Sequence, residues 1–138
     1  MFDECLYFNT VALARRLERE WTIAFKPFGL SPSQAFLLRT ILNRPGLLQR
    51  ELADALAISR PTATRVLDGL ANKGLIERRD SERDGREYAI HPTRKSAALL
   101  SPLNEASAKV TKRLKKQLSE EVFANTVSRM RGVRTALE

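Results

Sequence analysis

The stretch that decides the fold runs from Leu48 to Ile90 and reads LQRELADALAISRPTATRVLDGLANKGLIERRDSERDGREYAI. Its first half holds two short segments with apolar residues at steps of three and four, the spacing of amphipathic helices. A tight turn at Ala57–Ile58 separates them. Its second half holds two short alternating segments joined by a charged loop, which is typical of a β-hairpin. This order predicts a helix-turn-helix followed by a hairpin wing, a shape that fits against duplex DNA.

The second helix of this stretch is expected over 60–73, with Ser59 as its N-cap. Ala63, Val66, Leu67 and Leu70 would face inward, which leaves small, hydroxylated and basic residues on the outside of the first turns. Arginine can bond bidentately to guanine, and threonine can bond phosphate or touch a thymine methyl. We therefore predict that the helix enters the major groove with Ser59, Arg60, Pro61, Thr62, Thr64 and Arg65.

The hairpin is expected from short strands at 76–79 and 87–90, with Asp84-Gly85 as its turn signal. Arg83 and Arg86 would project from its tip, where arginine can enter a narrow minor groove. Asp80 and Asp84 are expected to pair with the wing arginines and hold the tip in shape, in preference to a ligand or metal role. The predicted DNA-contacting set is completed by Lys73, Arg79, Arg83 and Arg86.

Long helical patterns flank this region. Residues 3–28 carry an apolar stripe with helical spacing. Two later helices carry similar stripes; the first is expected to be capped by Thr93 and bent by Pro102, and the second to be capped by Ser119. None of these stripes has a partner in a compact monomer. A further helix starts at Ser31-Pro32 and would bury Ala35, Phe36, Leu38, Ile41 and Leu42. The expected fold is mainly α-helical: a winged helix-turn-helix over 31–92, with dimerisation helices over 1–30 and 93–138.

Charge supports a polyanionic partner without identifying it. The net charge is +8 and the sequence pI is about 10.2. Residues 31–92 hold ten basic and eight acidic residues, whereas 93–138 hold ten and four, so most of the excess lies outside the reading region. The basic residues 109–116 are either a solvated face or the border of a DNA footprint. Placement of individual arginines therefore carries more weight than net charge.

Several classes of protein are disfavoured. The apolar runs are too short to span a membrane, and the N-terminus lacks the pattern of a secretory signal, so a cytoplasmic protein is expected. One cysteine and one histidine make an internal disulfide impossible and a zinc site improbable. No nucleophile–base pair, paired carboxylates or phosphate loop is visible, so we expect neither an enzyme nor a cofactor.

A set of short motifs is spread along nearly the whole chain: Gly29-Leu30-Ser31, Phe36-Leu37-Leu38, Leu52-Ala53, Ser59, Thr64–Asp68, Leu70, Lys73–Arg78, Asp84-Gly85-Arg86 and Thr93. In these motifs the chain resembles the MarR family of bacterial transcription regulators. The wing differs from the family pattern, because Asp84-Gly85-Arg86 stands where Asp-Arg-Arg is usual, and no glycine follows the threonine of the next helix.

The resemblance implies an obligate homodimer whose first and last helices interlock. Such a dimer binds a pseudo-palindromic operator, typically as a repressor, and is released by a small aromatic or anionic ligand. By position in the family, the pocket for this effector would be lined by Arg15, Trp21, Phe25 and Phe36, although each is equally well interpreted as a core or surface residue.

Two alternatives stay open. A hydroperoxide-sensing branch of the family has its reactive cysteine near the position of Cys5, but Glu4 opposes thiolate formation and the tyrosines of that branch are missing. The other alternative is a winged-helix module that binds proteins, since fold does not decide function. Exposed apolar residues on the second helix of the motif would favour it, and arginine and threonine stand there instead.

Overall fold

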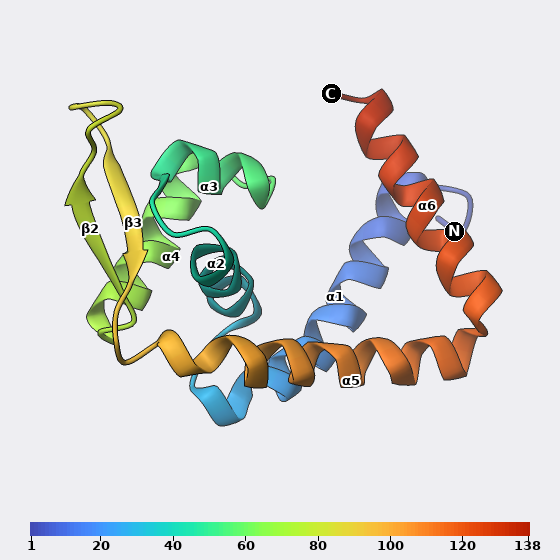
Figure 1. Cartoon of the computed structure of the whole chain (residues 1–138). Helices are drawn as coiled ribbons and strands as arrows, with labels where there is room; N and C mark the ends of the chain where they lie inside the picture. The colour runs from blue at the N-terminus through green and yellow to red at the C-terminus, as the bar shows by residue number, and fades with distance from the viewer.

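The computed structural model describes residues 1–138, and the chain is mainly helical with one small sheet (Figure 1). Helices α2, α3 and α4 gather beside the sheet, while α1, α5 and α6 extend away from it. This arrangement confirms the predicted winged helix-turn-helix with long helices towards both ends. No helix combines the length and the apolar character that crossing a membrane requires.

The first helix, α1, spans Leu6–Phe25 and runs into a 3₁₀ turn at Lys26–Phe28. Gly29 adopts a left-handed conformation (φ +67°) and its N–H donates to the Lys26 carbonyl at 2.9 Å, which ends the helical path. At the other end, the Cys5 sulfur accepts the Phe8 N–H at 3.5 Å as the N-cap. The prediction of a helix over 3–28 was therefore about one turn too long at each end.

Helix α2 spans Pro32–Asn43 and begins as predicted. The Ser31 hydroxyl accepts the Gln34 N–H at 3.2 Å, and the Gln34 side chain accepts the Ser31 N–H at 3.1 Å, which makes a reciprocal capping box. The prediction that Phe36 is buried was wrong, because Phe36 is 39% exposed and Leu37 takes the inward position. With about 100° between successive residues, Leu37, Leu38 and Ile41 share one face and Phe36 is turned from it.

The reading head, residues 31–92, combines three helices with a three-stranded antiparallel sheet of order β1-β3-β2. Leu48 pairs with Ala89, and Ala89 pairs on its other side with Arg79. The strand β1 was not predicted, and it attaches the start of α3 to the wing. The bounds of these elements are β1 Leu47–Leu48, α3 Gln49–Ala55, α4 Arg60–Asn72, β2 Ile76–Asp80 and β3 Tyr88–Pro92.

The core lies where α2, α3, α4, β3 and the start of α5 meet, and it fixes α4 against the rest of the head. Gly69 of α4 packs so closely on α2 that an added Cβ would lie 2.7 Å from the Gln34 side-chain nitrogen. The inward residues predicted for α4 are all buried. The largest fully buried apolar side chains are Phe25, Leu37, Leu38, Ile41, Leu48, Leu52, Leu67, Leu70, Ile90, Leu103 and Val110.

The next long helix, α5, spans Leu100–Leu118 and follows a 3₁₀ turn at Ala97–Leu99. The prediction that Thr93 caps this helix was wrong. Its hydroxyl donates to the Gly74 carbonyl at 2.6 Å and so ties the end of the wing to the end of α4. Pro102 falls in the first turn of α5, where the N–H groups need no helical partner. The predicted bend at Pro102 within a continuing helix is therefore not needed.

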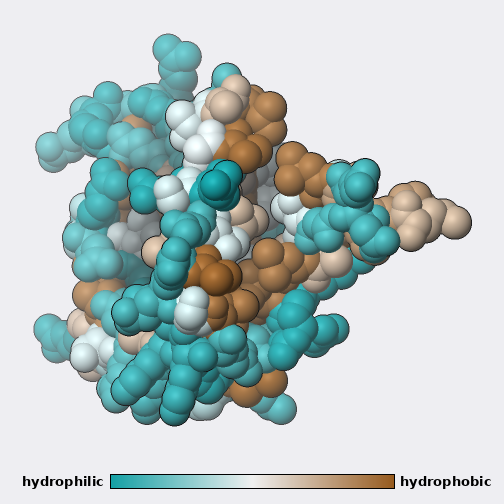
Figure 2. All heavy atoms as spheres, turned by 90° about the vertical axis from the view of Figure 1, so that its right-hand side faces the viewer, coloured by the Kyte–Doolittle hydropathy of each residue, from teal (hydrophilic) through white to brown (hydrophobic).

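The last helix, α6, spans Glu120–Ala136 and has no buried residue. Ser119 caps it, accepting the Val122 N–H at 3.3 Å, and adopts φ +76° and ψ +154° at the sharp corner between α5 and α6 (Figure 1). Figure 2 views this side of the molecule and shows apolar residues gathered on its surface. On α1 and α6 the exposed large apolar side chains include Leu6, Tyr7, Phe8, Leu13, Ile23, Val122, Val127, Met130 and Val133.

Candidate nucleic-acid interface

The N-terminal turns of α4 present an exposed polar surface. The Ser59 hydroxyl accepts the Thr62 N–H at 3.2 Å and caps the helix, and Pro61 occupies its first turn. Arg60 and Arg65 are exposed, and neither side chain has an ion-pair or hydrogen-bond partner. The positive dipole at this end of α4 adds a preference for anions.

The turn before α4 fixes how α3 and α4 cross. Ala57 adopts φ +54°, a conformation that is uncommon for a residue with a side chain, and the Ile58 N–H donates to the Ala53 carbonyl at 3.0 Å. Ile58 itself is half-buried. Gln49 of α3 donates to the Thr64 hydroxyl at 2.6 Å, which joins the two helices on the exposed side. Gln49 was not among the predicted site residues.

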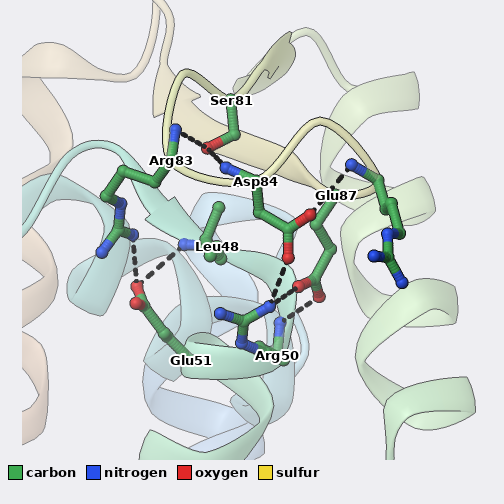
Figure 3. A network of polar contacts seen from close by, with 8 residues as sticks. Leu48, Arg50, Glu51, Ser81, Arg83, Asp84 and Glu87 are labelled. Carbon is green, nitrogen blue, oxygen red and sulfur yellow. Dashed lines mark hydrogen bonds and ion pairs between the residues drawn. The ribbon is translucent and has the colours of Figure 1, made fainter.

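The wing loop is fastened to α3 by a group of five charged residues that we call the wing clasp: Arg50, Glu51, Arg83, Asp84 and Glu87 (Figure 3). One guanidinium nitrogen of Arg50, Nη1, donates to Asp84 at 2.8 Å and to Glu87 at 2.7 Å. Arg83 donates to Glu51 at 2.9 Å. The prediction that Asp84 pairs with a wing arginine was therefore wrong, since its ionic partner comes from α3.

The pKa values of the clasp follow from these contacts. The hydrogen bond from Arg83, with that from the Leu48 N–H, lowers the pKa of Glu51. The backbone N–H of Arg86 and the side chain of Arg50 lower the pKa of Asp84. The hydrogen bond to Asp84 raises the pKa of Arg50, and that to Glu51 raises the pKa of Arg83. All four shifts favour the charged forms of these side chains.

The basic residues predicted to contact DNA fall into two groups: those whose side chains are bound by other protein groups, and those whose side chains are free. Arg79 pairs with Glu77, and Arg83 belongs to the clasp. Lys73 donates to the Gly29 carbonyl and, at 3.1 Å, to Gln34, so its ammonium joins the end of α4 to the start of α2. Arg60, Arg65 and Arg86 have no carboxylate partner. Asp80 forms no ion pair and does not hold the wing tip as predicted.

Of the residues predicted for an effector pocket, the structure brings Phe25 and Phe36 together and places Arg15 elsewhere. Phe25 is buried and its ring meets that of Phe36 edge to face, with centroids 6.0 Å apart. Trp21 donates to the Ser107 hydroxyl at 3.1 Å. Arg15 lies in a different groove, with Glu18, Arg19, Thr22 and Ile23. Cys5 is exposed and is occupied as the N-cap of α1.

Sequence comparisons find relatives among transcriptional regulators. Residues 28–87 match the model of the MarR family. A protein of Thauera aromatica, named as a transcriptional regulatory protein for the hcr operon, is 33% identical over 102 residues, which cover 68% of this chain and 61% of that protein. The uncharacterized HTH-type transcriptional regulator YybA of Bacillus subtilis is 31% identical over 83 residues, or 60% of this chain and 55% of that protein. The alignments thus span less than two thirds of either relative.

Solved structures share the fold over nearly the whole chain. The transcriptional repressor CouR, bound to a 23-mer DNA duplex, superposes with a TM-score of 0.86 and 26% identity, covering 96% of this chain and 94% of that one. The MepR–DNA complex of S. aureus gives a TM-score of 0.84 at 22% identity, covering 95% and 96%. The curated relatives are thus named as transcriptional regulators, residues 28–87 match the MarR family, and nearly the whole chain shares the fold of CouR.

Proposed function

We propose that this protein is a sequence-specific DNA-binding transcriptional regulator that places α4 in the major groove and the wing in the adjacent minor groove. The observation that carries the proposal is the position of the unpaired guanidinium groups. Arg60 and Arg65 lie free on the outer side of α4, and Arg86 lies free on the wing. A free guanidinium can bind phosphate or a base edge without first breaking an ion pair.

The relatives support the same function. CouR and MepR were solved on DNA, and the curated relatives are named as transcriptional regulators. Within the proposed footprint, Ser59, Pro61, Thr62 and Thr64 lie beside the two α4 arginines on one exposed end of the helix. Lys73, Arg79 and Arg83 are held by protein groups, and we therefore assign them secondary roles at most.

The test is selection of binding sites from a library of random duplexes by the purified protein. The expected product is a pseudo-palindromic sequence whose half-sites lie about one helical turn apart. Guanine N7 atoms in the major groove should be protected from methylation by dimethyl sulfate, and the flanking minor-groove positions from hydroxyl-radical cleavage. Affinity for it should fall steeply with salt. If repeated rounds of selection enriched no sequence, the proposal would be wrong, and a protein-binding role for the winged helix would replace it.

We further propose that the regulator acts as a homodimer through the helical region formed by 1–30 and 93–138. A compact monomer of 15.6 kDa exposes roughly 7,300 Å², whereas this chain exposes 9,737 Å². The excess is about 2,400 Å² and matches what one protomer of an obligate dimer contributes to its interface. The exposed apolar side chains of α1 and α6 supply the material for such an interface.

Repression and release by a small anionic or aromatic ligand are the finer part of the proposal. A groove of about 510 Å³ between α2, α5 and the start of α6 is lined by Arg39, Ser107, Lys112 and Lys115, among others. The Arg39 guanidinium lies over the Phe36 ring at 4.9 Å, and its Nη1 atom is buried without a hydrogen-bond partner. A buried N–H without an acceptor is costly, so an anionic group that supplied one would be stabilised.

Benzoate, the simplest aromatic carboxylate, is the probe for this groove. We expect it to bind with a dissociation constant in the millimolar range or below and to weaken operator binding. Arg39→Met should abolish both effects, whereas Arg15→Met, a change in the separate groove on α1, should leave both unchanged. Calorimetry measures the binding of benzoate, and fluorescence anisotropy of a labelled operator measures the release of DNA. Loss of benzoate binding in the Arg15 variant alone would contradict this assignment.

A further inference from the structure

We propose that Arg50 is a positioning residue for DNA binding: it holds the wing loop on α3 and thereby fixes where Arg86 lies. The inference rests on the proposed function, because Arg86 is taken as the wing residue that enters the minor groove. It assigns to α3, the first helix of the motif, a role in the wing contact that is separate from its packing against α4.

Arg50 is connected to Arg86 through a short chain of hydrogen bonds. Its Nη1 donates to Oδ2 of Asp84 at 2.8 Å, and the other oxygen of that carboxylate, Oδ1, accepts the backbone N–H of Arg86 at 3.0 Å. Glu87 holds the other side of Arg86, because its Oε2 accepts from Arg50 Nη1 at 2.7 Å and its Oε1 from the Arg50 backbone N–H at 2.9 Å. Asp84, which precedes Arg86 by two residues, and Glu87, which follows it directly, are thus both bound to Arg50 of α3.

A second contact fastens the earlier part of the loop. Arg83 Nη2 donates to Oε2 of Glu51 at 2.9 Å, and the same oxygen accepts the Leu48 N–H at 3.0 Å (Figure 3). Inside the loop, the Ser81 hydroxyl accepts the N–H groups of Arg83 and Asp84 at 3.1 and 3.3 Å. The loop therefore has a defined shape and is held at two points by successive residues of α3.

The charges of the clasp indicate that it acts through Arg86 and does not itself bind the DNA backbone. Three carboxylates, from Glu51, Asp84 and Glu87, surround two guanidinium groups. A phosphate approaching Arg50 or Arg83 would meet these carboxylates first and would have to displace one. Arg86 is the wing-loop arginine without such a neighbour. Partly exposed ion pairs are individually weak, but together they restrict a loop that must otherwise be ordered on binding.

The decisive experiment is a double-mutant cycle on the duplex selected by the wild-type protein. Arg50→Met is expected to weaken binding about tenfold, inside the range known for coupled neighbours. Arg86→Ala should weaken it by at least as much, and the double variant should bind no more weakly than Arg86→Ala alone. If the two losses multiplied, Arg50 would have a contact of its own and the inference would be wrong. Wild-type affinity in Arg50→Met would overturn it as well.

A measurement on the protein without DNA can test the role of Arg50 independently of the proposed function. NMR order parameters of the backbone amides 81–87 are expected to fall in Arg50→Met, while those of α4 stay at wild-type values. Asp84→Asn, which keeps the side-chain shape, should loosen the same loop and covers the case in which Arg50→Met fails to fold. Arg44→Met is the matched control, because Arg44 is exposed and has no ionic partner. Unchanged order in both clasp variants would refute the clasp even if the wild type selected an operator.

Discussion

At the scale of single residues, what distinguishes the arginines of the reading head is the partner each one has. Arg50, Arg78, Arg79 and Arg83 are paired with carboxylates, so their charges are largely neutralised within the protein. The sequence shows ten basic residues between 31 and 92 but not which of them are paired. A pair such as Arg50–Asp84 joins residues 34 positions apart, and no local pattern reports it.

The first prediction concerns two of the unpaired arginines. Arg65→Ala should reduce discrimination by roughly 1–3 kcal/mol at the bases that Arg65 reads, with little effect on binding of unrelated sequence. Arg86→Ala should weaken binding more evenly across sequences. Competition between operator variants, followed by fluorescence anisotropy, separates the two patterns. Arg79→Ala serves as the control, because Arg79 is already paired with Glu77 and its loss should change operator affinity by less than either.

A second prediction concerns the backbone of Ser119. Its φ of +76° with ψ of +154° belongs to a region that is nearly restricted to glycine and costs about 1–3 kcal/mol for other residues. Ser119→Gly should therefore stabilise the protein by about 1 kcal/mol, since glycine at an N-cap loses only a few tenths relative to serine. Ser119→Ala keeps the strain and loses the cap, so it should destabilise by a similar amount. Urea denaturation at a fixed protein concentration compares them, and equal midpoints would contradict the expectation.

At the scale of elements, the sequence was sufficient for the helices of the reading head and insufficient for what joins them. The apolar spacing and the caps at Ser31 and Ser59 predicted the starts of α2 and α4 correctly. Strand β1 was missed because two residues, Leu47 and Leu48, are too few to show alternation. Thr93 was misassigned because a threonine before a helical pattern signals a cap, whereas here its hydroxyl bonds the Gly74 carbonyl.

The wing clasp leads to a prediction about pH. Glu51 and Asp84 have lowered pKa values in the folded protein. A carboxylate of this kind stabilises the fold above its unfolded pKa of about 4, and the contribution is lost as the pH falls through the lower, folded value. Order parameters of residues 81–87 should therefore be the same at pH 8 and pH 5.5 and fall only below about pH 4. A loss of order between pH 7 and 5.5 would show that another group holds the loop.

At the scale of the whole molecule, the apolar surface of α6 should determine the oligomeric state. Val127 and Met130 are 42% and 40% exposed, although both belong to the stripe that the sequence marks as apolar. We expect Val127→Glu with Met130→Glu to give monomers in sedimentation equilibrium and to lose operator binding, because one head offers only half of the contacts. The matched control is Arg129→Glu with Arg131→Glu on the same helix. Monomers in the control, or dimers in the apolar variant, would argue against α6 as the interface.

Internal charge pairing in the reading head also bears on how a regulator of this kind finds its target. Counting Arg60, Arg65 and Arg86 in each protomer, a dimer would bring six unpaired guanidinium groups to a duplex. With Arg65 reading bases, the four groups from Arg60 and Arg86 would give a log–log dependence of affinity on salt with a slope of about −4. Random sequence, which offers Arg65 few matching bases, would hold the dimer weakly. The dimer would dissociate quickly from non-operator DNA and could therefore search the genome rapidly.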